Sequence, residues 1–430
     1  MIRNLKIRNI GPAPEMALEF GKRLNLLTGD NGLGKSFLLD IVWWALTRKW
    51  PAEVNVKLTS GKKAMPSGEG KATISFTFVG RAKEESYEST FDRKEQAWTG
   101  RAGRPSNPGL VLYAQVDGSF AVWDPARNYW RKKGTIDVQD RPSSYVFSPQ
   151  EVWDDLIGED GKPLCNGLVR DWAGWQKENG EAFQNLQSAV AALSPSRDEK
   201  MIPGKLTRIS LDDPRDIPTL KMPYGQEVPV LHASAGMKRI IALAYLLVWA
   251  WEEHKNASKL LDQDTTNQII FLIDEIESHL HPRWQRRILS ALVEVMNSLT
   301  QKAEVQIITA THSPLILASV EPLFDPKKDA WFDLDYAHSD NDKGVVLTRR
   351  NFELHGDVSN WLTSVAFDLS SARSLESEKL LEEASGLIAK TDVTSWDVKA
   401  MHEKLCKALN PKDAFLFRWR AICEKKGFLK

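Results

Sequence analysis

Eight residues near the start of the chain have the types and spacing of a phosphate-binding loop. Gly29 to Ser36 read Gly-Asp-Asn-Gly-Leu-Gly-Lys-Ser, which fills every fixed position of Gly-x4-Gly-Lys-Ser/Thr. Glycines let backbone N–H groups turn toward a phosphate, Lys35 would reach the β- and γ-phosphates, and Ser36 would ligate Mg²⁺. The pattern predicts a nucleoside triphosphate site; the alternative is a glycine-rich turn that matches by coincidence. The expected contacts to ATP are Gly29, Asp30, Asn31, Gly32, Leu33, Gly34, Lys35, Ser36 and Phe37.

Two further polar groups follow apolar runs of the kind that form buried strands. Asp274 and Glu275 come directly after Ile269 to Ile273; one carboxylate can support Mg²⁺ and the other can polarise an attacking water. His312 follows the run 305–310 and could sense a γ-phosphate. The competing interpretations are solvated acids at a strand end and a structural histidine.

A serine and a glycine begin the longest predicted helix. Ser234 and Gly236 precede and open an apolar helix expected over 237–254. Serine is an ordinary helix N-cap, but a helix start with exposed N–H groups can also receive a phosphate.

The elements that must position these groups indicate an α/β protein. Continuous apolar runs at 24–27, 269–273 and 305–310 are typical of strands buried in a parallel sheet, and helices are expected over 37–46 and 284–299. Strands near 5–10, 17–20, 71–79, 110–114 and 120–123 predict an antiparallel β lobe, with 331–336 and 344–348 as a hairpin around Ser339 to Asp342. Helices are predicted over 150–157, 168–177 and 181–193, and again over 375–390, 396–409 and 413–426.

The order of these motifs resembles that of the ATP-binding-cassette class of ATPases, in the soluble branch that includes SMC proteins, RecF and OLD-type ATPases. Residues 274–282, Asp-Glu-Ile-Glu-Ser-His-Leu-His-Pro, followed by Ala-Thr-His-Ser-Pro at 310–314, are typical of that branch. The resemblance implies that Lys35, Glu275 and His312 are catalytic, that Ser36 and Asp274 hold Mg²⁺, and that Ser234 and Gly236 contact ATP bound by a second copy. It also makes Gln150 a metal or water ligand, with Gln115 as a competitor. The signature segment departs from the usual Leu-Ser-Gly-Gly-Gln and reads Ala-Ser-Ala-Gly-Met.

Composition narrows the class of protein further. Lys plus Arg and Asp plus Glu both number 57, so the net charge is zero and gives no argument for nucleic-acid binding. No apolar stretch is long enough for a membrane helix, and the three cysteines lack metal spacing. We therefore expect a cytoplasmic protein without a membrane partner.

The resemblance implies four segments. They are a nucleotide-binding lobe with the phosphate loop and the antiparallel β subdomain over 1–150, a helical lobe without a coiled-coil arm over 151–232, the signature helix and catalytic strands over 233–350, and a helical appendage over 351–430. The expected fold class is thus an ABC-ATPase head, with a P-loop sheet core, a β lobe and a helical lobe, plus the appendage.

Compact ATPases of this branch resemble components of bacterial antiphage systems of the Septu and retron type. This similarity implies an ATPase that dimerises head-to-tail around ATP and Mg²⁺ and regulates a separate effector such as an HNH or TOPRIM nuclease. A RecF-like clamp on DNA and an ATP-gated scaffold without hydrolysis are the alternatives. Asp333-Leu334-Asp335 superficially matches a TOPRIM metal motif, and Phe415 to Arg420 interleaves aromatic and basic residues, as a surface for nucleic acid or a partner protein would.

Overall fold

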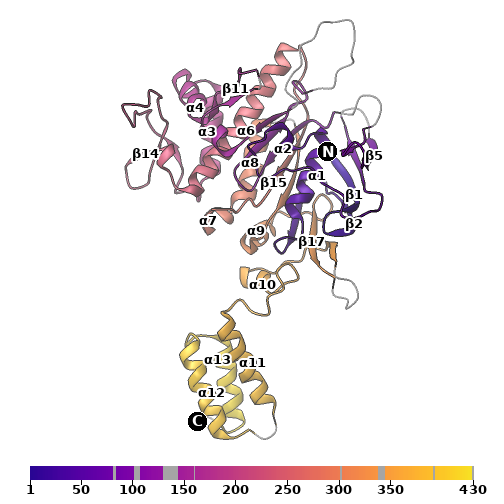
Figure 1. Ribbon diagram of the computed structural model, residues 1–430. Helices are drawn as coiled ribbons and strands as arrows, with labels where there is room; N and C mark the ends of the chain where they lie inside the picture. The colour runs from indigo at the N-terminus through magenta and orange to yellow at the C-terminus, as the bar shows by residue number, and fades with distance from the viewer. Residues whose placement is uncertain are drawn as a thin grey trace. The chain divides into compact units, whose positions relative to one another are not determined.

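The computed structural model describes residues 1–80, 84–100, 107–128, 144–158, 160–300, 303–337, 344–390 and 393–428. The chain divides into two compact units, Met1–Gly356 and Asp357–Lys430 (Figure 1). The predicted α/β fold class is confirmed, with a central sheet, an antiparallel lobe, a helical lobe and a set of C-terminal helices. No helix within the described ranges is both long and apolar enough to cross a membrane.

An eight-stranded sheet forms the centre of the first unit. Its strand order is β18-β17-β3-β16-β15-β7-β8-β9. The bounds are β3 Leu24–Gly29, β7 Leu110–Ala114, β8 Phe120–Trp123, β9 Tyr145–Phe147, β15 Gln268–Ile273, β16 Glu304–Ala310, β17 Ala330–Tyr336 and β18 Val345–Arg350. Strands β17, β3, β16, β15 and β7 are mutually parallel. Their carboxyl ends therefore share one edge, where ligands of open α/β sheets bind.

Two strands were predicted in the wrong sheet. We expected 110–114 and 120–123 in the antiparallel lobe, but β7 pairs in parallel with β15, and β8 continues this same sheet. All five residues of β7 are buried, which fits a strand covered on both faces. The β17–β18 hairpin forms as predicted, and its expected turn at Ser339 to Asp342 lies outside the described residues.

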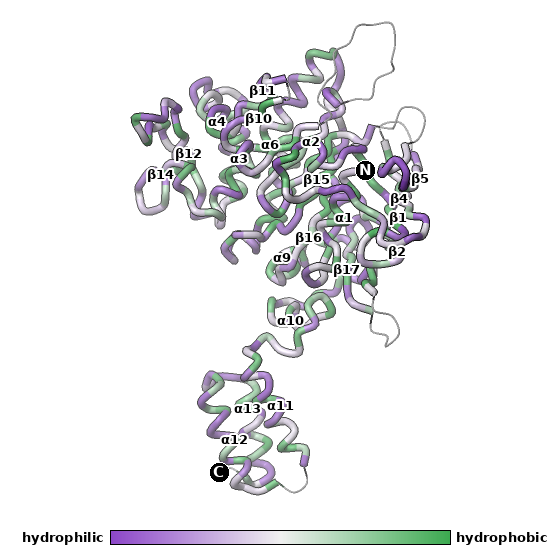
Figure 2. Tube along the Cα trace, in the orientation of Figure 1, coloured by the Kyte–Doolittle hydropathy of each residue, from purple (hydrophilic) through white to green (hydrophobic). Residues whose placement is uncertain are grey.

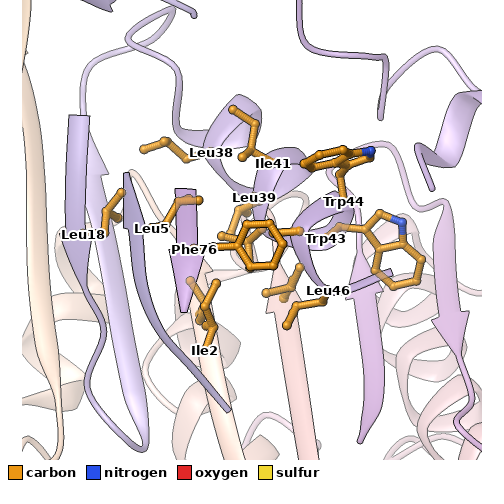
Figure 3. Packing of buried hydrophobic residues seen from close by; sticks show 14 of the residues in the cluster. Ile2, Leu5, Leu18, Leu38, Leu39, Ile41, Trp43, Trp44, Leu46 and Phe76 are labelled. Carbon is orange, nitrogen blue, oxygen red and sulfur yellow. The ribbon is translucent and has the colours of Figure 1, made fainter. Parts of the chain in front are cut away.

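A second sheet, antiparallel throughout, packs against the helix that follows the phosphate loop. Its order is β2-β1-β4-β5-β6, with β1 Ile2–Ile10, β2 Ala13–Glu19, β4 Thr73–Val79, β5 Glu84–Asp92 and β6 Ala97–Trp98. Helix α1, Lys35–Thr47, buries Leu39, Trp43 and Trp44 in the core that this sheet shares with the central one (Figure 3). Trp43 and Trp44 are thus packing residues, and they anchor the helix that begins at Lys35.

The helical lobe contains the helix that carries the signature residues. Helix α6 spans Ala235–Leu260, eight residues more than predicted, since 255–260 continue the helix beyond the predicted end and 235–236 precede the predicted start. The neighbouring elements are α3 Pro149–Trp153, α4 Gly167–Glu178, α5 Glu181–Ala192, the strand pair β10 Leu156–Ile157 with β11 Pro163–Cys165, and the three-stranded sheet β12 Ile202–Pro203, β13 Thr219–Lys221 and β14 Glu227–Pro229. The predicted helix 150–157 is wrong in its second half, which forms β10.

Short helices complete the first unit. They are α2 Pro51–Val54, α7 Pro282–Gln285, α8 Ile288–Thr300 and α9 Pro314–Val320, with a 3₁₀ turn at Val230–His232. The single helix predicted over 284–299 is therefore two helices.

The second unit is a set of amphipathic helices around its own small core. It contains α10 Val358–Leu362, α11 Leu375–Ala389, α12 Ser395–Ala408 and α13 Ala414–Lys425, and polar and apolar residues alternate along the last three (Figure 2). On α13, Leu416 and Trp419 enter the core, whereas Phe417 and Arg418 are exposed. The segment from Phe415 to Arg420 therefore contributes some side chains to the core and leaves others on the surface.

Candidate nucleotide-binding site

The polar groups predicted from the sequence gather at the carboxyl edge of the parallel strands. Ala310 of β16 is paired with Leu27 of β3, and Ile273 of β15 is paired with Ala114 of β7. Adjacent strands lie about 4.8 Å apart. The residues that follow these four strand ends therefore form one continuous row, from the phosphate loop to residue 115.

The phosphate loop has the backbone that anion binding requires. Gly29, Gly32 and Gly34 all have positive φ, at 129°, 81° and 102°, a region open mainly to glycine. No side chain caps the N-terminus of α1, and its first turn carries no acid. The first amides of α1 therefore remain available to a phosphate, where the helix dipole adds positive potential.

Lys35 is held in this loop by the loop's own carbonyl groups. Its Nζ donates to the carbonyl oxygens of Gly29 and Asp30, each at 2.8 Å. Burial lowers the pKa of the ammonium group, while Glu275 and Asp274 act in the opposite direction. A buried cation beside two carboxylates can balance the charge of a bound phosphate.

Asp274 is the residue whose surroundings fit a metal ion. Only 2% of it is exposed, and its Oδ1 has no hydrogen-bond partner among the described residues. Burial raises the pKa of this carboxyl to about 6, partly offset by the Ser36 hydroxyl beside it. A buried carboxylate oxygen without a partner, next to a serine at the start of α1, matches the oxygen ligands that Mg²⁺ prefers.

Glu275 and His312 form a pair from neighbouring strands. The distance between His312 Nε2 and Glu275 Oε1 is 3.1 Å, and both side chains are about one-third exposed. Burial, and then Lys35, lower the pKa of His312, while Glu275 acts in the opposite direction. Glu275 has a φ of 46°, a conformation that costs energy in a residue with a side chain and that recurs at functional sites.

Glu277, to which sequence reasoning gave no role, orients this pair. Its Oε1 accepts a hydrogen bond from the backbone N–H of His312. Burial raises the pKa of Glu277. The residue lies two positions after Glu275, inside the motif typical of the family, and this spacing was the available signal.

The signature residues Ser234 and Gly236 do not join the site within one chain. Ser234 is exposed and caps α6, where its Oγ accepts from the N–H of Met237 at 3.4 Å. A Cβ at Gly236 would come within 2.7 Å of the carbonyl oxygen of His279, so glycine is needed for the helix to approach the loop after β15. The functional reading of Ser234 thus depends on a second chain.

Arg239, also missed, ties this helix to the catalytic edge. Its guanidinium donates to the carbonyl oxygens of Val116 at 2.8 Å, Glu275 at 3.2 Å and Asp274 at 3.3 Å. One side chain therefore links the start of α6 to the ends of β7 and β15.

The two candidate glutamines are in different places. Gln150 is exposed on α3, beyond β9, which is the edge strand three positions from β15. Gln115 follows β7 directly beside Asp274, is 1% exposed, and accepts a hydrogen bond from Ser60 at 2.9 Å. The arrangement brings Gln115 rather than Gln150 beside Asp274, because the strand order places β7, not β9, next to β15.

A second, half-buried carboxyl, that of Asp40, lies one helical turn beyond Ser36. The hydroxyl of Tyr113, on β7, donates to Asp40 Oδ1 at 2.9 Å. Burial raises the pKa of Asp40 to about 7, and Asp274 contributes in the same direction. Asp40 therefore belongs to the electrostatic surroundings of Asp274.

Asp333, the first acid of the apparent TOPRIM motif, is occupied by structural contacts. Its Oδ1 accepts from Thr28 at 2.8 Å, and its Oδ2 accepts from Arg350 at 3.2 Å. In the described part of the chain no cluster of three His, Cys, Asp or Glu residues could hold a metal ion. Because both carboxylate oxygens of Asp333 are occupied by Thr28 and Arg350, the structure gives no support to the TOPRIM alternative.

Known proteins resemble the chain over 46% to 81% of its length. The chain is 24% identical to the Septu protein PtuA of Bacillus thuringiensis over 325 residues, 73% of this chain and 72% of that protein. It is 27% identical to a probable ATPase of retron Ec83 from Escherichia coli over 203 residues, 46% of this chain but only 32% of that protein. An SMC head domain from Thermotoga maritima aligns over 81% of this chain and 99% of that structure at 12% identity, with a TM-score of 0.39.

The family described as "AAA domain, putative AbiEii toxin, Type IV TA system" matches residues 24–318, which include the phosphate loop, the signature segment, Asp274, Glu275 and His312. This match covers more than half of the chain, and the protein belongs to this AAA-domain family.

Proposed function

We propose that the chain binds and hydrolyses ATP with Mg²⁺, closes into a head-to-tail dimer around the nucleotide, and thereby regulates a separate effector in antiphage defence. The observation that carries the proposal is the convergence of Lys35, Asp274 and the Glu275–His312 pair on one sheet edge, with one oxygen of Asp274 unpartnered. A buried, unpaired carboxylate costs stability and is retained where it serves a site.

Each group has a role that its position supports. The amides of the phosphate loop and Lys35 would hold the β- and γ-phosphates, and Ser36 and Asp274 would hold the metal, which supplies charge neutralisation during phosphoryl transfer. Glu275 would take a proton from the attacking water. His312 would donate its N–H to Glu275 in the nucleotide-free chain and to the γ-phosphate once ATP is bound, and Glu277 holds its backbone in place.

The exposed signature residues support the second half of the site coming from another copy of the chain. Ser234 is exposed at the start of α6, where the positive end of the helix dipole suits a phosphate presented from outside. The Glu275–His312 pair favours hydrolysis over a scaffold that only binds ATP, since a purely binding protein has no use for a base beside the phosphate.

The role in defence is supported by the relatives alone. They are a Septu protein and retron ATPases, and such a role would require an effector carried by another polypeptide, for which an HNH or TOPRIM nuclease is our proposal. The exposed cations of α13, Arg418 among them, are the surface that we would test for a partner or for DNA. In a Arg418→Glu/Arg420→Glu variant, loss of DNA binding would favour the repair-clamp alternative instead.

The test of the dimer is a variant that binds ATP and cannot hydrolyse it. We expect Glu275→Gln to convert from monomer to dimer when ATP and Mg²⁺ are added, as measured by light scattering after size-exclusion chromatography. Glu294→Gln, an exposed glutamate on α8, is the matched control and should hydrolyse ATP normally. If Glu275→Gln stays monomeric while it binds ATP, the head-to-tail dimer is refuted.

A further inference from the structure

A cavity of about 260 Å³ lies between the first three turns of α6 and the turn that joins β7 to β8. Its walls are mainly apolar and buried, and include Phe120, Leu246, Ile273 and Ile276. Ala235, Ala242 and Leu246 of α6 line it at helical spacing. No residue of the phosphate loop lines the cavity, although Gln115, which lies beside Asp274, does. The cavity therefore adjoins the candidate nucleotide site without including the loop.

The polar groups at this cavity leave an excess of positive charge. Lys238 and Arg239 line it, with Asp117 as the acid. Asp117 is turned toward its own loop, where its oxygens accept from the backbone N–H of Ser119 at 2.9 Å and from Ser60 at 3.3 Å. Within the described ranges no carboxylate forms an ion pair with Lys238, so this cation is available to an anion at the cavity.

The cavity is lined by both β15 and α6, whose relative position matters for the proposed dimer. Ile273 and Ile276 flank Asp274 and Glu275 on one side, and the opposite wall is the helix that begins at Ser234. Arg239 bridges the two sides through the carbonyl groups that it contacts. A molecule in the cavity would therefore set the position of the signature helix relative to the catalytic strand.

We propose that this cavity binds a small organic anion with an apolar body of about a dozen non-hydrogen atoms, and that its occupancy regulates ATP-driven association of the chain. The volume restricts the ligand to a small molecule, since a water molecule in the liquid occupies about 30 Å³ and 260 Å³ equals roughly nine of them. The apolar walls would bind the apolar part of the ligand, and Lys238 would bind its anionic group. The regulatory part rests on the proposed function, whereas the binding part does not.

The binding test uses 4-phenylbutyrate, titrated by calorimetry into the full chain without nucleotide. We expect one site, at least tenfold weaker binding in Ala242→Leu, which fills the cavity, and about fivefold weaker binding in Lys238→Gln. The neutral 4-phenylbutanamide should bind the wild type about as weakly as 4-phenylbutyrate binds Lys238→Gln. Lys259→Gln, an exposed lysine at the far end of the same helix, should bind like the wild type.

Two results would overturn the site: no binding of 4-phenylbutyrate, or equal binding to the wild type and Ala242→Leu. If Ala242→Leu is unfolded by circular dichroism, Lys238→Gln and the amide decide the question in its place. For regulation, saturating 4-phenylbutyrate should change the ATP concentration at which Glu275→Gln dimerises by at least threefold. Unchanged dimerisation at saturation overturns the regulation, and a Glu275→Gln variant that never dimerises refutes the proposed function while calorimetry still decides the site.

Discussion

Replacing Asp274 by asparagine should stabilise the metal-free protein while it abolishes ATP hydrolysis. The carboxyl group is 2% exposed, one of its oxygens has no partner, and burial raises its pKa from 3.8 to about 6. A carboxylate in such surroundings is less stable when ionised than it is in the unfolded chain. Asparagine removes the charge and keeps the shape, so the folded state no longer bears this cost.

The magnitude follows from the two pKa values. The difference between about 6 and 3.8 corresponds to about 3 kcal/mol of unfolding free energy. Because the folded-state pKa is the higher one, the folded protein binds more protons between the two values, and its stability falls as the pH rises from about 4 to 6. The gain in unfolding free energy from Asp274→Asn should therefore be absent near pH 4 and complete at pH 7. At pH 7 it corresponds to a rise of about 4 °C in the melting temperature of the first unit.

The assay is differential scanning calorimetry in a chelating buffer, at pH 4.5 and pH 7, for the wild type and two variants. Asp329→Asn is the matched control, because this buried aspartate is paired: it accepts from Arg23 Nε at 3.0 Å and from the N–H of Leu24 at 3.0 Å. We expect that control to be less stable than the wild type by about 1–3 kcal/mol. A melting temperature for Asp274→Asn at or below that of the wild type at pH 7 would refute the reasoning.

The remaining predictions concern the groups around this carboxylate. Glu277→Gln weakens the acceptor for the His312 backbone, so we expect a fall of about tenfold in kcat with an unchanged KM for ATP; an equal rise in KM would mean that the change disturbs binding instead. Gln115→Ala should raise the Mg²⁺ concentration for half-maximal hydrolysis by about tenfold, whereas Gln150→Ala should leave it unchanged. If Gln150→Ala raises this concentration and Gln115→Ala does not, Gln150 is the ligand instead. Gly29→Ala would place a Cβ 2.2 Å from the carbonyl oxygen of Leu334 on the adjacent strand. We therefore expect a loss of more than about 3 kcal/mol of unfolding free energy. Soluble, folded protein at wild-type yield would contradict this expectation.

Much of the site was predictable because it consists of short segments at strand ends. Apolar runs identify β3, β15 and β16, and in a parallel sheet the residues after such strands must share an edge. Lys35, Asp274 and His312 could therefore be placed together without coordinates. The three C-terminal helices were predicted almost to the residue, since their 3.6-residue periodicity and N-caps are local signals.

Besides the helix bounds, the errors concern long-range pairing. Residues 110–114 were assigned to the antiparallel lobe because a short apolar strand does not carry the identity of its partner, and this assignment also left Gln115 and Gln150 unresolved. The contacts of Glu277 and Arg239 were missed for the same reason, because a buried carboxylate and an arginine that donates to carbonyl groups have no local pattern.

The sequence alone predicted the chemical groups: a phosphate loop, a carboxylate for Mg²⁺, a second carboxylate as general base and a histidine. Each was tied to its element by local periodicity and backbone preference. The tertiary structure alone decided which groups meet. It placed β7 beside β15, so that Gln115 lies next to Asp274, left one oxygen of Asp274 without a partner, and kept Ser234 exposed at the surface. The physical reason is that propensity and spacing act within a segment, whereas strand order and burial arise only when distant segments exclude water from a common core.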